Sequence, residues 1–212
     1  MEPNITHSDE KVNSMSSILA KLHEWMSSKP IKLYDSADYP TTVKQDSSLK
    51  IVPEEFRPHF IEAAKHANVP VNEYVMHSVA ENGGNFDPKL RGQIDPNDYG
   101  IMQMSPQAVQ EITKPREGGK SFFEQNYGEK FNPEDPRHQI VGSSVYMNFL
   151  KQYSLPEAGI KNPTADDIRY SYNMGAKGYA DFKAGKGDAT STKRYETYKK
   201  NLEKGKSMLP VD

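Results

Sequence analysis

Apolar residues recur at helical spacing along the chain from residue 53 onward. Between Val71 and Val79 they fall on one face. Pro70 suits the first turn of that helix because its missing N–H would be unpaired there, and Gly83-Gly84 is a typical helix end. The same spacing predicts further helices around residues 56–64, 105–113, 136–153, 164–172 and 193–204. Sustained alternation of apolar and polar residues is absent from the sequence, so we predict a mainly α fold.

The N-terminal part of the sequence has only one weak helical pattern. Its apolar positions are Ile18, Leu19, Leu22 and Trp25, and a segment with prolines and serines, residues 27–48, follows. We interpret residues 1–52 as a loosely structured N-terminal arm and a possible attachment segment. Residues 53–212 are long enough to bury a core, and we predict that they form one domain.

Composition narrows the classes of function. The net charge of −2 and the pI near 6.3 argue against a general nucleic-acid binder, which normally has a strong basic excess. The sequence has no cysteine, which excludes disulfides and thiolate chemistry. No stretch approaches the roughly 20 apolar residues of a membrane span, and the N-terminus lacks the basic and apolar regions of a secretory signal. We expect no nucleic-acid partner, no transmembrane segment and no signal peptide.

Motifs for common cofactors fail on their spacing. The EGGKS segment lacks a phosphate-loop glycine because Lys114 stands at its position. A calcium loop starting at Asp95 would need a bidentate glutamate at its twelfth position, which is Pro106. The six histidines form no His-Glu-x-x-His pair. We therefore predict neither a metal nor another cofactor.

Three short segments remain as candidates for chemistry. The first is Glu81, followed by Phe86-Asp87-Pro88; the second is Gly100-Ile101-Met102-Gln103; the third runs from Tyr170 to Gly175 with the sequence YSYNMG. A tyrosine-rich helix containing Tyr195 and Tyr198 follows. Taken singly, each has an ordinary explanation as a solvated helix end, core methionines or a helix cap.

In this order and on a helical background, the segments resemble the catalytic domain of the soluble lytic transglycosylases, relatives of goose-type lysozyme. Gly100 to Gln103 is similar to the family's Gly-Leu-Met-Gln, and residues 171–175 are similar to its Ala-Tyr-Asn-x-Gly. The stretches DPRHQIVGSSVYMNFLKQY and KRYETYKKNL look like its middle and last helices. The resemblance covers roughly residues 55–205 and implies a lysozyme-like helical domain with a sugar-binding cleft.

The sequence departs from the family pattern next to the glutamate. Asn82 replaces the family's serine, and Glu81 lies five residues before Phe86, where the family usually has three. The amide of Asn82 is able to donate a hydrogen bond to the Glu81 carboxylate. Glu73 and Glu111 are the competing carboxylates, but neither matches the position of the family's glutamate.

The resemblance implies cleavage of peptidoglycan glycan strands between N-acetylmuramic acid and N-acetylglucosamine, with a 1,6-anhydromuramoyl product. Glu81 would be the single catalytic acid and base, and its pKa should be raised so that it is protonated near neutral pH. The resemblance also assigns substrate contacts, to Met102 and Gln103 in the cleft, Tyr172 and Asn173 across from the glutamate, and Tyr195 on the floor.

Two other functions remain open at this stage. One is hydrolysis by a muramidase, and the other is a non-catalytic wall-binding or virion assembly module with the same fold. Because the substrate lies outside the cytoplasm and no signal peptide is evident, we expect a bacteriophage virion protein delivered to the host periplasm or cell wall. Its N-terminal arm would bind phage tail or ejection proteins.

Overall fold

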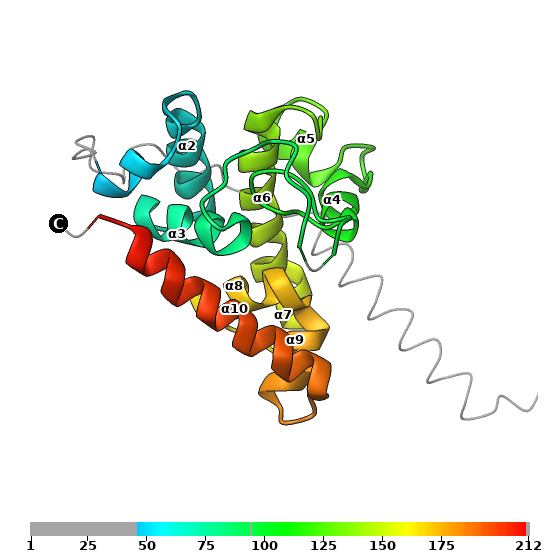
Figure 1. Cartoon of the computed structure of the whole chain (residues 1–212). Helices are drawn as coiled ribbons and strands as arrows, with labels where there is room; N and C mark the ends of the chain where they lie inside the picture. Colours follow the sequence, from blue (N-terminus) through cyan, green and yellow to red (C-terminus); the bar gives the residue numbers. More distant parts are fainter. Residues whose placement is uncertain (1–45, 94, 211–212) are drawn as a thin grey trace, which may run out of the picture. The chain divides into compact units, whose positions relative to one another are not determined.

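The computed structural model describes residues 46–93 and 95–210, and helices make up most of this part of the chain (Figure 1). Within those ranges, β-type pairing is limited to isolated bridges from Tyr99 to Arg91 and to Met104. The prediction of a mainly α fold is therefore confirmed. The weak helical pattern around Ile18 and Trp25 lies outside the described residues.

Two 3-10 turns and a series of α-helices, one continued by a π-helical turn, succeed one another along the chain. They are η1 (Ser47–Ile51), η2 (Glu54–Phe56), α2 (Arg57–Ala67), α3 (Val71–Asn82), α4 (Pro106–Thr113), α5 (Phe122–Tyr127), α6 (Pro136–Phe149), the π-helical turn η3 (Leu150–Ser154), α7 (Leu155–Glu157), α8 (Ala165–Met174), α9 (Ala176–Lys183) and α10 (Ala189–Met208).

The sequence pattern did not predict α5 and α9, and it placed the start of α10 too late. Helix α5 is short, but Ser121 and Glu124 form a capping box in which each side chain bonds the other's backbone N–H. Helix α10 begins at Ala189 because the Asp188 carboxylate accepts a hydrogen bond from the N–H of Ser191 at 2.7 Å. Local capping thus sets both of these helix starts.

Helix α6 forms the centre of the core and packs against α2 and α4 (Figure 1). Its residues from His138 to Met147 are all buried, as expected for a helix with neighbours on every side. Gly142 allows the ring of Phe131 to approach closely, since a Cβ there would lie 2.6 Å from that ring. The same helix supplies Gln139, which holds the loop of the candidate site.

Helix α3 carries Glu81 and packs against α2 and α10. All residues from Tyr74 to Ala80 are buried. Gly205 of α10 permits close packing, because a Cβ there would lie 3.1 Å from the carbonyl oxygen of Met76. This packing brings Tyr198 of α10 to His77 in α3.

Residues 46–52, which fall in the predicted arm, consist of η1 (Ser47–Ile51) with its caps Asp46 and Val52, and they contribute Leu49 and Val52 to the core. Turn η1 contacts α3. The packed part of the chain thus includes these seven residues. None of the described helices is both long enough and apolar enough to span a membrane.

Candidate functional site

Glu81 lies in the last turn of α3, just before the helix ends. Gly83 stops the helix in a left-handed conformation (φ 69°), and its N–H donates to the carbonyl of Val79. The Glu81 residue is partly exposed, yet its Oε1 atom is buried and has no hydrogen-bond partner among the described residues. A buried carboxyl oxygen of this kind favours the neutral acid.

The surroundings raise the pKa of the Glu81 carboxyl to about 8. Burial is the largest cause, and the negative charge of Asp98 adds to it. Hydrogen bonding by Tyr198 and Asn173 acts in the opposite direction. The raised pKa expected from the sequence is confirmed, and Glu81 is mostly protonated at neutral pH.

Asp98 is a second carboxylate beside Glu81, and sequence reasoning missed it. It lies in the loop between α3 and α4, and burial raises its pKa to about 6, with a further contribution from Asp95 and an opposing one from Arg194. At neutral pH the pair thus consists of a neutral Glu81 and a mostly ionised Asp98. Pairs of carboxyl groups with separated pKa values are typical of acid and base catalysis.

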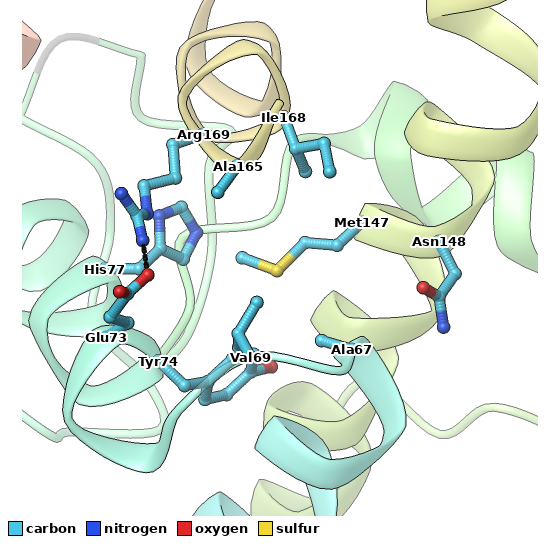
Figure 2. A pocket seen from close by; sticks show the side chains of 10 residues that line it. All are labelled: Ala67, Val69, Glu73, Tyr74, His77, Met147, Asn148, Ala165, Ile168 and Arg169. Atoms are coloured by element: carbon cyan, nitrogen blue, oxygen red, sulfur yellow. Dashed lines mark hydrogen bonds and ion pairs between the residues drawn. The ribbon is translucent and has the colours of Figure 1, made fainter. Parts of the chain in front are cut away.

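The two carboxylates that the sequence offered as competitors have other partners. Glu73, in the first turn of α3, forms an ion pair with Arg169 of α8 (Figure 2). Glu111 forms an ion pair with Arg116 at 3.3 Å. Both are therefore engaged in salt bridges, whereas Oε1 of Glu81 has no partner among the described residues.

The Gly-Ile-Met-Gln segment forms a tight loop whose side chains point largely inward. Gly100 has a φ of 78° and Gln103 a φ of 46°, both in the left-handed region. The N–H of Ile101 donates to Oε1 of Gln139 at 3.0 Å, and Nε2 of Gln103 donates to the carbonyl of Gly100 at 2.7 Å. Met102 is fully buried and Gln103 is 8% exposed. Their contact with a saccharide stays a prediction.

Asn82 connects this loop to α3, and its amide donates to Ile101 and Ser78 instead of the Glu81 carboxylate. Its Nδ2 donates to the carbonyl of Ile101 at 2.9 Å and to Oγ of Ser78 at 3.1 Å. Its Oδ1 accepts from the N–H of Gly84 at 2.7 Å. Both amide hydrogens are therefore used, and the Asn82 amide, although able to donate to the Glu81 carboxylate, donates to other acceptors.

Helix α8 contributes Tyr172 and Asn173 to the site. The Tyr172 hydroxyl donates to the carbonyl of Met102 at 3.0 Å, so it joins α8 to the Gly-Ile-Met-Gln loop. Asn173 is partly exposed, and it acts to lower the pKa of the Glu81 carboxyl. The structure thus brings Asn173 to the glutamate and Tyr172 to the neighbouring loop, and their contacts with substrate stay predictions.

The tyrosine of α10 beside Glu81 is Tyr198. Tyr195 instead stacks on Tyr170 and Phe182, with ring centroids 4.4 and 4.5 Å apart. Tyr198 is 1% exposed, and it acts to lower the pKa of the Glu81 carboxyl. The two tyrosines are three residues apart in the sequence, and the tyrosine-rich pattern did not distinguish them. The role of Tyr195 in substrate binding stays a prediction.

His77 is a further residue of the candidate site, and sequence reasoning did not identify it. It is 1% exposed, its Nδ1 lies 2.6 Å from the Tyr198 hydroxyl, and its ring packs edge-on against Tyr172. Burial, with a smaller effect of the Arg169 charge, lowers the pKa of His77 to about 3. The imidazole is therefore neutral at every pH at which Glu81 titrates.

A serine, a histidine and an asparagine also meet elsewhere in the core. Nδ1 of His66 lies 2.9 Å from Oγ of Ser144, and its Nε2 lies 2.9 Å from Oδ1 of Asn126. Ser144 is fully buried, so no substrate reaches its hydroxyl. We interpret this cluster as packing between α2, α5 and α6.

No group of three potential metal ligands gathers within residues 46–93 and 95–210.

Comparisons of the chain with known protein families, with curated proteins and with solved structures find no match.

Proposed function

We propose that the protein is a lytic transglycosylase that cleaves the glycan strand of peptidoglycan with Glu81 as its acid and base. The observation that carries the proposal is the carboxyl of Glu81, with its pKa raised to about 8 at the C-terminal end of α3. A glycosidic bond needs a proton on its leaving oxygen, and a carboxyl that is still protonated at neutral pH supplies one. Two residues that influence its pKa, Asn173 and Tyr198, belong to the segments that resemble this enzyme family.

The reaction uses one carboxyl group twice. Neutral Glu81 donates its proton to the glycosidic oxygen, the C1–O bond breaks, and the N-acetyl group of the muramic acid stabilises the cationic centre. The Glu81 carboxylate then accepts the proton of the C6 hydroxyl while that oxygen bonds to C1. The product is a 1,6-anhydro sugar, and Glu81 is protonated again at the end of the turnover.

Asn173 is the residue best suited to meet the sugar beside Glu81. It is partly exposed, and its amide group pairs with hydroxyl and N-acetyl groups. Met102, Gln103 and Tyr172 are buried, so we propose that they support the Gly-Ile-Met-Gln loop from the interior of the protein. Tyr195 is partly exposed, but its ring stacks on Tyr170 and on Phe182, so its proposed contact with the sugar would involve the ring edge and the hydroxyl.

The proposal is tested by the products that the wild type and Glu81→Gln release from purified peptidoglycan. We expect the wild type to release anhydromuropeptides, which mass spectrometry distinguishes because they are lighter by one water than hydrolysis products. Glu81→Gln should release none while remaining folded by circular dichroism. Glu111→Gln is the matched control and should retain activity. Full activity of Glu81→Gln would refute the proposal, and a wild type that binds sacculi without releasing products would indicate a non-catalytic module.

Asp98 favours hydrolysis as a second candidate function. Glycosidases commonly use one neutral and one ionised carboxyl group, the second activating a water or attacking the sugar. Asp98 provides the ionised group near Glu81. If Asp98 serves as a base, Asp98→Asn should abolish the hydrolytic product, whereas an anhydro product needs Glu81 alone.

Delivery by a bacteriophage particle through the N-terminal arm also stays a proposal, and mass spectrometry of purified particles tests it.

A further inference from the structure

Helix α10 is basic, although the protein as a whole is slightly acidic. The helix carries six lysines and arginines and only two glutamates, whereas the whole chain has a net charge of −2. Figure 1 shows α10 as the long red helix next to the C-terminus. Its positive charge is therefore a local feature, and the packing of the helix decides which face presents it.

The inward face of α10 is fixed by its contacts with α3. Tyr198, Leu202 and Gly205 are the buried residues of the helix. The Tyr198 hydroxyl lies 2.6 Å from Nδ1 of His77, and a Cβ at Gly205 would lie 3.1 Å from the carbonyl oxygen of Met76. The opposite face of α10 therefore points away from α3.

Three lysines form a line along this outward face. At about 100° per residue, Lys193, Lys200 and Lys204 lie on the side of α10 opposite its buried residues. All three are exposed. With a rise of about 1.5 Å per residue, the line is about 16 Å long. We call these three lysines the basic stripe.

The ammonium groups of the basic stripe are free to bind a ligand. No ion pair or side-chain hydrogen bond engages them within residues 46–93 and 95–210. Of the two glutamates of α10, Glu203 pairs with Lys206 at 2.9 Å, and Glu196 lies exposed beside the stripe. Lys200 and Lys204 are four residues apart on the helix and repel each other. An anionic partner would relieve this repulsion.

We propose that the basic stripe is a second wall-binding surface, which binds the carboxylates of the peptide stems of peptidoglycan. A lysine ammonium is a compact point charge on a flexible side chain, which suits carboxylates whose positions vary along a polymer. The stripe points away from α3, which carries Glu81, so it binds stems outside the cleavage site. This surface holds the protein on the polymer while Glu81 acts on another part of it.

The choice of partner rests on the proposed function, because peptidoglycan is its substrate and carries free carboxylates on its peptide stems. Successive stems along a strand offer several carboxylates to a row of cations about 16 Å long. Duplex DNA is the competing anionic polymer. The acidic net charge of the chain disfavours it, because the remaining surface would repel the phosphate backbone.

Binding of the full-length protein to purified sacculi tests the surface. All proteins carry Glu81→Gln, so that the polymer stays intact during the measurement. The stripe variant combines Lys193→Gln, Lys200→Gln and Lys204→Gln. The control variant combines Lys114→Gln, Lys120→Gln and Lys130→Gln, which change three exposed lysines at the ends of α4 and α5 and alter the net charge equally. Circular dichroism checks that all of them are folded.

We expect the stripe variant to bind sacculi about tenfold more weakly, and the control variant to bind within about twofold of the parent protein. Binding of the parent should weaken between about 50 and about 300 mM NaCl, since salt screens exposed charges. Sacculi whose carboxyl groups have been converted to amides should bind the parent as weakly as the stripe variant. Sacculi stripped of phosphate polymers with hydrofluoric acid should bind it as before.

Equal binding by the stripe variant and the parent would overturn the proposal and show an ordinary solvated helix face. An equal loss in both lysine variants would also overturn it, because net charge alone would then explain the binding. Unchanged binding to the amidated sacculi, or loss of binding after the acid treatment, would exclude stem carboxylates. Tighter binding of a duplex DNA oligomer through the same lysines would assign the stripe to nucleic acid.

The outcomes for the stripe and for the proposed function are separable. Release of anhydromuropeptides by the wild type, together with full binding by the stripe variant, would refute the second surface and keep the enzyme. Stripe-dependent binding by a protein that releases no products would refute the enzyme and keep the surface.

Discussion

The raised pKa of Glu81 should be measurable as a pH-dependent stability of the whole protein. The carboxyl ionises with a pKa of about 8 in the folded protein and with its ordinary value of 4.5 when exposed. Below pH 4.5 both states hold the proton, and the folded state is not penalised. Between these two values the unfolded state releases the proton first, so the free energy of unfolding falls as the pH rises and levels off above 8.

The size of this effect follows from the difference between the two pKa values. At about 1.4 kcal/mol for each pH unit, the loss amounts to about 5 kcal/mol at most, a large fraction of the stability of an ordinary domain. Glu81→Gln removes the ionising group, so the variant should gain stability relative to the wild type as the pH rises through this window. Even half of that gain would exceed the error of a denaturation experiment.

Urea denaturation of both proteins at several pH values provides the assay. We expect the difference in the free energy of unfolding between Glu81→Gln and the wild type to grow from low pH to about pH 9. The titration of Asp98 contributes to both proteins and largely cancels in the difference. Glu203→Gln is the control, since this side chain is 64% exposed in its ion pair with Lys206. A difference for Glu81→Gln that does not change with pH would refute the buried, protonated carboxyl.

Two further substitutions test how the loop of the site is held. Asn82→Ala removes the hydrogen bonds to the carbonyl of Ile101 and to Oγ of Ser78, and we expect a loss of about 1–3 kcal/mol in urea denaturation, whereas no loss would contradict the link. Gly100→Ala should lower the melting temperature more than Gly118→Ala, because both have positive φ but only the Cβ at Gly100 would collide with Gln139. Equal effects of the two glycine variants would show that this close contact is unimportant.

The helices that the sequence predicted best are those whose apolar residues face a large neighbour. The stripe from Val71 to Val79 is buried in α3, and the helix stops at Gly83 as predicted. Helix α6 was also predicted, although its last predicted turn is the π-helical segment Leu150–Ser154. Apolar spacing is a strong signal here because burial of one face decides the secondary structure. Helix α9, which starts directly after Gly175, has no such extended stripe.

The resemblance placed Asn173 across from Glu81, but the approach of Asp98 and the pairing of His77 with Tyr198 could not be predicted, because they join parts of the chain that the sequence does not relate. His77 and Tyr198 are separated by 121 residues and meet only because α10 packs on α3. Asp98 is brought back by the loop between α3 and α4, where the N–H of Gly100 donates to the carbonyl of Leu90 and Tyr99 pairs with Met104. Spacing along the sequence contains no direct information on either approach.

Asn82, which stands where the resemblance predicts a serine, supports the loop and does not affect the burial of Glu81. A serine hydroxyl at this position would have one hydrogen to donate, whereas the Asn82 amide donates two and its oxygen accepts a third bond from Gly84. Asn82 thereby fixes the start of the glycine turn and the Ile101 carbonyl together. The pKa of Glu81 depends instead on burial, Asp98, Tyr198 and Asn173. Substitution of Asn82 should therefore affect the stability of the loop more strongly than the titration of Glu81.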